Sequence, residues 1–344
     1  MNNIILAGAS LTEIQDLIRQ EGYGISHARN IAVAIHRKRI RDFLLFEGIP
    51  KKLRLFITQR ASIGDYPPEK SEISSDGSVK YLFRNPTGLL YETVYIPEGK
   101  RHTVCVSVQS GCRMGCPFCV TSGYGFHGNL SSGDIINQVR NVPPADKLNH
   151  VVFMGMGEPL DNLDNVLKAC TILTSEWGMA FSPRKVTVST VGITPGVISF
   201  LERTDCNLTL SLFSPFREER IKVVPAEKNW PAEEIVGIMG KIKADERRRF
   251  SVAYVMIKGV NDTERHLEGL KTMLKGTRIR VNLLPYHSIP GDQAAASSES
   301  VMMQFRHELV MSGISASIRS SRGEDISAAC GLLASGLRTH DGKN

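Results

Sequence analysis

Gly111-Cys112-Arg113-Met114-Gly115-Cys116-Pro117-Phe118-Cys119 is the stretch from which the rest of this 344-residue chain is best understood. It holds three of the seven cysteines on one loop, with no fourth thiol or imidazole on that loop, directly after a predicted strand at Val104–Val108. Cysteine thiolates are the usual ligands of iron–sulfur clusters, and zinc also binds them. A structural zinc site normally closes with a fourth ligand, whereas three ligands leave one metal position open for a substrate. The stretch therefore predicts a catalytic metal centre, with structural zinc or chance spacing as the alternatives.

Downstream of this loop, predicted strands and helices alternate to the end of the chain. The further strands are expected at His150–Met154, Lys185–Ser189, Asn207–Leu212, Phe250–Ile257 and Arg278–Leu284. The helices are expected at Ser131–Arg140, Leu163–Glu176, Pro195–Arg203, Ala232–Ala244, Glu264–Lys275 and Ser298–Ser312. Six such units predict an α/β fold with a parallel sheet and right-handed crossovers, closed into a partial (β/α)6 barrel. In such barrels the chemistry collects at the loops after the carboxyl ends of the strands.

Upstream of the barrel the pattern is different. Residues 10–61 have helical periodicity, with Ser10 as a predicted N-cap, Glu13 three residues later, and a second helical segment at Ile31–Phe46. Residues 61–78 are polar and predict a linker, and the turn signal Asp76-Gly77 introduces alternating strands on either side of residue 87. We expect four parts: a helical, basic domain with its linker (1–75), a β extension (76–102), the barrel core (103–334) and a disordered tail (335–344).

Composition is that of a folded, soluble protein, with 42% apolar and 22% charged residues. No apolar run approaches the ~18 residues that a membrane span needs. The opening residues resemble no signal peptide, so we expect a cytoplasmic protein that does not bind a membrane. The net charge of +7 is compatible with a nucleic-acid partner. Nine Lys/Arg against two acidic residues lie between Arg29 and Arg60, either to contact RNA or simply as a solvated helix face.

A second motif gives the cysteine loop its context. Met154-Gly155-Met156-Gly157-Glu158-Pro159 follows the second predicted strand, one βα unit after the cysteines. With Cys-x3-Cys-x2-Cys and an aromatic residue before the last cysteine, the chain resembles the radical S-adenosylmethionine (SAM) superfamily. That resemblance implies a 4Fe–4S cluster on Cys112, Cys116 and Cys119, and a SAM molecule bound to its open iron. The cofactor-binding residues implied are Gly157, Glu158, Pro159, Ser189, Ser211 and His287.

Further stretches narrow the resemblance to one branch, the RlmN/Cfr family of RNA adenine methyltransferases. They cover essentially residues 91–333 and are Thr103–Gln109, Ser189-Thr190-Val191-Gly192, Ser211-Leu212, Gly259-Val260-Asn261-Asp262, Val281–Tyr286 and Ala328-Ala329-Cys330-Gly331. Taken alone, Cys105 and Cys330 would be small buried hydrophobic residues. The resemblance implies instead that Cys330 is methylated by one SAM and that a radical from a second SAM activates this methyl group. The activated carbon then adds to adenine, Cys105 resolves the covalent adduct, and Glu92 lies near the base.

The helical, basic region 1–75 is similar in kind to the family's RNA-contacting accessory domain. The resemblance also implies partners and a target. The RNA would be 23S rRNA, possibly also tRNA, and flavodoxin or ferredoxin would donate electrons. Pro159 after the glutamate favours carbon 2 of adenine. Three positions depart from the family pattern: Phe213 replaces a histidine, His287 an asparagine and Leu332 a glutamine. Alternatives are methylation of carbon 8, a radical SAM enzyme for another substrate, and a catalytically silent RNA-binding scaffold.

Overall fold

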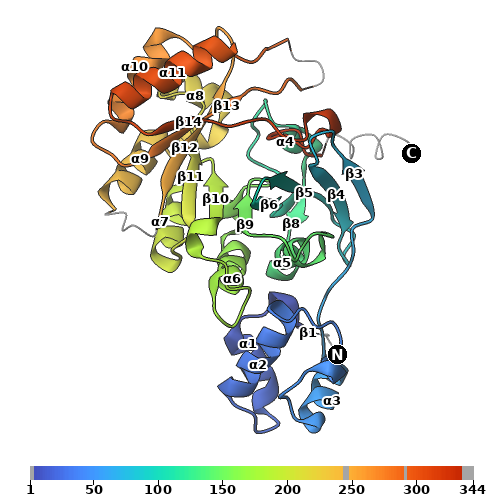
Figure 1. Cartoon of the computed structure of the whole chain (residues 1–344). Coiled ribbons are helices and arrows are strands. Elements are labelled where there is room, and N and C mark those ends of the chain that lie inside the picture. The colour runs from blue at the N-terminus through green and yellow to red at the C-terminus, as the bar shows by residue number, and fades with distance from the viewer. Residues whose placement is uncertain (1–3, 243–247, 290–292, 335–344) are drawn as a thin grey trace.

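The fold is built on one ten-stranded sheet that curves into a partial barrel (Figure 1). The computed structural model describes residues 4–242, 248–289 and 293–334. The strand order is β14-β13-β12-β11-β10-β9-β6-β5-β4-β3, parallel from β14 to β6 and antiparallel beyond. The barrel strands are β6 (Arg101–Cys105), β9 (His150–Phe153), β10 (Val186–Thr190), β11 (Asn207–Ser211), β12 (Phe250–Met256), β13 (Arg280–Pro285) and β14 (Ala316–Ile318). The predicted partial barrel is confirmed.

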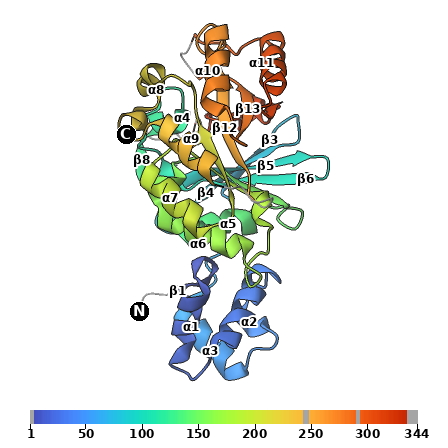
Figure 2. The same cartoon turned by 90° about the vertical axis from the view of Figure 1, so that its left-hand side faces the viewer.

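Helices form an outer arc around the barrel strands, as Figures 1 and 2 show from two sides. They are α5 (Ser132–Asn141), α6 (Leu163–Thr174), α7 (Thr194–Arg203), α8 (Arg217–Val223), α9 (Ala232–Lys241), α10 (Glu264–Leu274) and α11 (Glu299–Met311). All six predicted barrel helices are present within a few residues. The predicted last three residues of the fourth helix include 243 and 244, which lie outside the described residues.

Buried apolar and partly exposed residues alternate along the barrel strands, so one face of a strand packs against the helices and the other faces the inside of the barrel. In β10, Val186 and Val188 are buried against the helices, whereas Thr187 and Ser189 lie on the other face and are partly exposed. The same pattern recurs in β12, with Val252 and Tyr254 buried and Ser251 between the strand's apolar positions. The apolar face supplies the core, since burial of each such side chain stabilises by about 1.5–3 kcal/mol. The polar face is left to line the inside of the barrel.

The β extension joins the barrel through an antiparallel ladder. It contains β3 (Lys70–Ile73), β4 (Val79–Arg84) and β5 (Leu90–Glu98), and β5 pairs with β6. The turn at Asp76-Gly77 connects β3 to β4 as predicted, with Gly77 at φ +83°. The linker predicted over 61–78 is wrong in part, because β2 (Ala61–Ser62) and β3 lie within it. All four residues of β3 are exposed, so the strand has no apolar alternation by which sequence could indicate it.

The N-terminal helices lie below α5 and α6, at the opposite end of the molecule from α10 and α11 (Figures 1 and 2). They are α1 (Leu11–Arg19), α2 (Ile25–His36) and α3 (Lys51–Arg60), and a two-stranded sheet of β1 (Ile4–Ile5) with β2 joins the chain ends of this region. The predicted cap is present: Ser10 and Glu13 bond each other's backbone N–H in a capping box. Gly8 packs so closely on α5 that a Cβ there would lie 2.3 Å from the Gly133 nitrogen.

The second predicted helix, Ile31–Phe46, is wrong at both ends. Helix α2 starts six residues earlier and ends at His36, followed by a short 3-10 turn at Phe43–Leu45. The chain reverses at Arg39, whose φ of +52° is incompatible with a continuing right-handed helix. Arg39 also donates to the Ala145 carbonyl (2.6 Å), and Arg41 to the Asn141 side chain (2.8 Å). Two of the basic side chains in this segment therefore attach the helices to the barrel.

Candidate active site

The three cysteines of the loop converge on one cavity of about 220 Å³ at the carboxyl ends of the barrel strands. We call it the cofactor cavity. The loop leaves β7 (Gln109–Gly111), which pairs with β8 (Phe126–Asn129), and it ends at α4 (Val120–Tyr124) directly after Cys119. Gly111 has φ +77°, and a Cβ there would overlap the Gly125 carbonyl oxygen, so this turn requires glycine.

The donor set fits an iron–sulfur cluster. Burial, together with the nearby Cys119 thiol and the Glu158 carboxylate, raises the pKa of Cys112 and of Cys116 to about 12. Ligating thiols must be deprotonated, so a positively charged metal centre supplies the compensation that these three groups lack. Ligands of one zinc ion converge on a single point. Within the described residues, no group of three or more His, Cys, Asp or Glu is arranged to hold one metal ion.

The Gly-Glu-Pro loop after β9 forms the facing wall of the cofactor cavity. Glu158 is buried, and its carboxylate accepts hydrogen bonds from Thr190 Oγ1 (2.6 Å) and the Val191 amide (2.9 Å). Burial raises its pKa to about 7. Gly157 has φ +96°, and a Cβ there would lie 2.5 Å from Gln109 Cβ. Gly157 and Glu158 line the cavity, whereas Pro159 begins the following 3-10 turn and does not.

Two serines expected to contact the cofactor come from neighbouring strands. Ser189 ends the polar face of β10 and Ser211 that of β11, and their hydroxyl oxygens are 3.3 Å apart. Both line the cofactor cavity. Their hydroxyls point to the same space as the three thiols, so the structure brings these predicted residues together.

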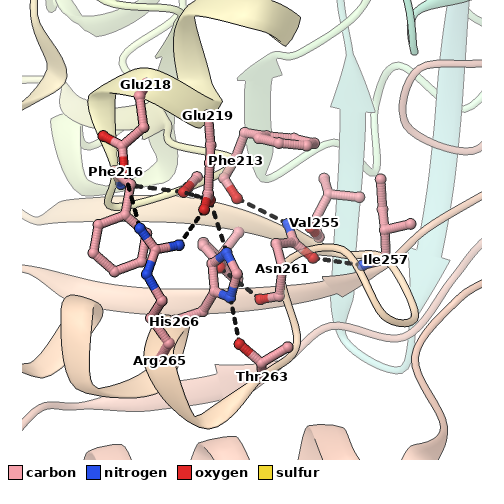
Figure 3. A network of polar contacts seen from close by, with 12 residues as sticks. Phe213, Phe216, Glu218, Glu219, Val255, Ile257, Asn261, Thr263, Arg265 and His266 are labelled. Atoms are coloured by element: carbon pink, nitrogen blue, oxygen red, sulfur yellow. Dashed lines mark hydrogen bonds and ion pairs between the residues drawn. The ribbon is translucent and has the colours of Figure 1, made fainter.

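Phe213 stands in the cavity wall where the family pattern has histidine. Its ring stacks on Phe118 of the cysteine loop, with centroids 5.6 Å apart and planes 14° from parallel. Its backbone has φ +63°, which non-glycine residues rarely adopt. Asn261 holds this conformation by donating to the Phe213 carbonyl (2.8 Å) and to the Val255 carbonyl (2.7 Å), as Figure 3 shows. The wall that replaces the histidine is therefore aromatic and held rigidly from behind.

Two further polar groups near this wall had no sequence signal. Buried Arg220 donates to the carbonyls of Ser211 (3.0 Å) and Leu212 (2.9 Å) and pairs with Glu227. In Figure 3, buried His266 bridges Glu219 (2.8 Å) and Thr263 (2.7 Å). Each of these side chains belongs to a helix whose charge pattern resembles a solvated face, so the sequence pattern does not distinguish them from surface residues.

A second cavity of about 460 Å³ occupies the barrel nearer the amino ends of the strands. We call it the basic cavity, because seven Lys/Arg line it with Glu98 as the acidic residue: Arg101, Arg184, Lys185, Arg249, Arg280, Arg319 and Arg322. Cys105, near the end of β6, lies in its wall. Burial and the neighbouring Cys330 thiol raise the pKa of Cys105 well above that of an ordinary thiol. Cys105 is therefore separate from the three loop cysteines, in a different kind of surrounding.

Cys330 lines both cavities. Its side chain is exposed to this internal space, and the surrounding protein, followed by the Cys119 thiol, raises its pKa. The segment that carries it is attached to α4: the Val120 amide donates to the Gly331 carbonyl (2.8 Å), and Thr121 Oγ1 donates to the Leu333 carbonyl (3.0 Å). Cys330 thus has thiol neighbours on both sides, Cys119 in one cavity and Cys105 in the other.

Glu92 is buried and faces the Cys330 segment instead of either cavity. Its carboxylate accepts from the Ala334 amide (2.7 Å) and lies 3.6 Å from Lys80 Nζ. Lys80 in turn donates to the Ile326 carbonyl (2.7 Å). Burial raises the Glu92 pKa, while Lys80 opposes the rise. In this structure the Lys80–Glu92 pair anchors the segment on either side of Cys330, and Glu92 is a buried carboxylate and not a surface one.

His287 is the other predicted residue that lines both cavities. Its Nε2 lies 2.7 Å from Ser321 Oγ and its Nδ1 lies 3.1 Å from Glu324 Oε1. Both ring nitrogens thus have partners in the segment that leads to Cys330. The histidine is placed at the boundary between the cavities.

Comparisons with known proteins agree with this geometry. Residues 106–268 match the Radical SAM superfamily. A crystal structure of a radical SAM methyltransferase from Sphaerobacter thermophilus is 34% identical and superposes with a TM-score of 0.87, over 96% of this chain and 99% of that one. The barrel with its three-cysteine loop is thus that of a radical SAM enzyme.

Relatives similar over the whole chain define the family. A probable dual-specificity RNA methyltransferase RlmN from Parabacteroides distasonis is 41% identical over 96% of both chains. One from Bacteroides thetaiotaomicron is 40% identical over the full length of both. The dual-specificity RNA methyltransferase RlmN of Syntrophotalea carbinolica is 36% identical over 96% of this chain and 89% of its own. This chain belongs to the RlmN family of radical SAM methyltransferases, and membership implies a 4Fe–4S cluster and SAM as cofactors.

No helix in the described ranges is both long enough and apolar enough to cross a membrane.

Proposed function

We propose that this enzyme methylates a ring carbon of adenine in RNA through a methyl group carried on Cys330. One observation supports this most: Cys330 belongs to the walls of both the cofactor cavity and the basic cavity. A methyl carrier has to meet the cofactor and the substrate, and a side chain at the boundary of two cavities can meet both without a large movement.

The cofactors supply the step that side chains cannot perform. Cys112, Cys116 and Cys119 would hold the cluster, and Gly157, Glu158, Ser189 and Ser211 would surround SAM. When bound, this pair provides a carbon radical able to take hydrogen from the methyl group of Cys330. Two SAM molecules are needed in each turnover, one for the methyl group and one for the radical. A flavodoxin or ferredoxin would supply the electron that reduces the cluster.

The chain's own residues would then carry the methyl carbon to RNA. The activated carbon on Cys330 would add to the electron-poor adenine ring, which would then lose its ring hydrogen as a proton and one electron to the cofactor pair. The Cys105 sulfur would attack the Cys330 sulfur, so that the carbon–sulfur bond of the adduct breaks, the released carbon takes up a proton to become the methyl group, and a Cys105–Cys330 disulfide forms. An external thiol would reduce this disulfide before the next turnover. Cys105 is well placed for this role because it lies in the wall of the basic cavity, close enough to Cys330 for that thiol to raise its pKa. Glu92 would act by anchoring the Cys330 segment, and His287 would lie at the boundary where cofactor and base approach.

The basic cavity supports RNA as the substrate. Its seven cationic side chains suit a polyanion, since Lys/Arg contacts to phosphates supply most of non-specific nucleic-acid affinity. The relatives named RlmN are dual-specificity RNA methyltransferases. We therefore propose 23S rRNA and tRNA as the two substrates and carbon 2 as the target, with carbon 8 as the alternative.

Mapping of methyladenosine isomers in cells with and without the gene tests this proposal. We expect 2-methyladenosine in 23S rRNA and in tRNA to disappear on deletion and to return with the wild-type chain, but not with Cys330→Ala. An 8-methyladenosine that follows the gene would favour the alternative carbon. Unchanged adenosine modification in both RNAs would contradict the proposed function.

A further inference from the structure

A third cavity lies outside the barrel, between the end of α2 and the segment that joins α6 to β10. Its volume is about 320 Å³, and we call it the α2 pocket. Its polar lining is His36, Arg37, Arg39, Asn149, Ser182 and Lys185. None of the described residues that line it is Asp or Glu. A polar pocket with three cations and no lining acid is suited to an anion.

His36 is the unexplained group in this pocket. Its side chain is 1% exposed, and neither ring nitrogen has a hydrogen-bond partner among the described residues. The buried Arg140–Asp65 pair lies close enough to act electrostatically on it, but Arg140 is occupied by Asp65 and by the Ile35 carbonyl. A buried polar group without a partner costs about 1–3 kcal/mol. A ligand that accepts a hydrogen bond would remove this cost.

The three cations retain free capacity. Arg37 reaches the Glu176 carbonyl at 3.4 Å, at the limit of a hydrogen bond, and Arg39 uses one terminal nitrogen for the Ala145 carbonyl. A guanidinium has five N–H groups, so both can still donate to an oxyanion, and two at once suit phosphate geometry. Lys185 is exposed and forms no ion pair in the described part of the chain. Asp65 and Asp146 act on Arg39 from outside the pocket lining.

Lys185 also lines the basic cavity of the barrel. The two cavities thus share a side chain, and the cationic lining continues from the α2 pocket over Lys185 to Arg184 and Arg249. An isolated small anion would need only one pocket. A polynucleotide has phosphates at regular spacing and can follow a continuous cationic path.

We propose that the α2 pocket binds a backbone phosphate of the RNA whose target base enters the basic cavity. The inference rests on the proposed function and extends it: His36, Arg37, Arg39 and Lys185 would form the phosphate subsite. RNA would then approach from the amino ends of the strands, while the cluster and SAM occupy the carboxyl ends. In this proposal the N-terminal helices do more than add positive charge: together with barrel residues they form a defined phosphate subsite.

The test compares two double variants that each lose two positive charges. Arg37→Gln with Lys185→Gln removes two exposed cations of the pocket. The control, Arg29→Gln with Lys51→Gln, removes two exposed cations of the N-terminal helices that do not line the α2 pocket. The affinity of holoenzyme for an rRNA fragment is measured against salt concentration. We expect the salt slope of the pocket variant to become about one to two units shallower, and that of the control to change much less.

A second measurement uses the imidazole NMR signals of His36. We expect them to shift when the RNA fragment is added to the wild-type enzyme, and to shift less in the pocket variant. Equal salt slopes in the two double variants, or His36 signals that do not move when the wild-type enzyme binds the RNA fragment, would overturn the inference alone. Failure of the wild-type enzyme to bind RNA would overturn the proposed function together with it.

Discussion

The two cavities of the barrel are both lined by strands β9 to β13, but their linings differ in chemistry, and among the described residues β6 and β14 line only the basic cavity. Among the described residues, the cofactor cavity is lined by thiols, small hydroxyls and aromatic rings, with Glu158 and no Lys or Arg. The basic cavity is lined by polar strand residues and seven Lys/Arg. On β11, Thr209 lines the basic cavity and Ser211, two residues later, lines the cofactor cavity. The polar face of one strand therefore lines the basic cavity at one position and the cofactor cavity nearer its carboxyl end.

This difference explains why two sets of cysteines exist in one barrel. Radical chemistry needs an enclosed site that excludes water and competing groups, which the apolar rings around the cysteine loop provide. A polyanion needs cations that it can reach, and the basic cavity supplies seven of them. Cys330 lies where the two environments meet, because the segment that carries it is anchored to α4 on one side and to the Lys80–Glu92 pair on the other.

The largest expected effect comes from substitution of the loop cysteines, which tests whether the cofactor cavity holds the cluster. Cys112→Ala, Cys116→Ala or Cys119→Ala each removes one of three anionic ligands, so we expect loss of the cluster and of all turnover. Iron content and the visible absorption of the anaerobically purified protein measure this. Cys170→Ala is the matched control, since that buried cysteine lies on α6 away from both cavities. Full iron content in any loop variant would contradict the assignment.

A smaller effect is expected from two substitutions on strand β11, one in the lining of each cavity. Ser211→Ala removes a hydroxyl from the cofactor cavity, and Thr209→Val removes one from the basic cavity while keeping the side-chain shape. A lost hydrogen bond is worth about 0.5–1.5 kcal/mol. We expect Ser211→Ala to weaken SAM binding a few-fold and leave RNA affinity unchanged, with the reverse for Thr209→Val. Titration calorimetry with each ligand measures both. Equal effects of both variants on both ligands would show that the cavities are not separate.

Much of the fold could be predicted from sequence, because barrel strands and helices have strong local signals. The six strands and six helices each bury an apolar face, and Val186 and Val188 show how alternation marks one. The N-terminal region is harder to predict from sequence, because long-range contacts decide where its elements end. Helix α2 ends at His36, three residues before Arg39 takes a left-handed conformation and donates to the Ala145 carbonyl, a contact 106 residues away in sequence. Strand β3 exists through its ladder to β4, and its exposed side chains carry no signal.

The site was predictable to the extent that its residues lie in compact motifs. Cys112, Cys116 and Cys119 are read from spacing, and Gly157 and Glu158 from their place after the second strand. The positions of Cys105 and Cys330 came from resemblance, since a lone cysteine has no spacing to interpret. Residues that support the site from behind, such as Arg220 and Asn261, are identified only by three-dimensional contacts. The separation into two cavities likewise depends on which side chains from different strands and loops meet in three dimensions.

The division of labour between Cys105 and Cys330 is the central claim, and one measurement tests it most directly. Anaerobic turnover with radiolabelled RNA is followed by denaturing gel electrophoresis of wild type, Cys105→Ala, Cys330→Ala and the double variant. A residue that acts after the adduct forms traps it when removed. We therefore predict a covalent protein–RNA band that accumulates in Cys105→Ala and is absent from Cys330→Ala and the double variant. RNA methylation by both single variants, with no adduct in either, would contradict the account.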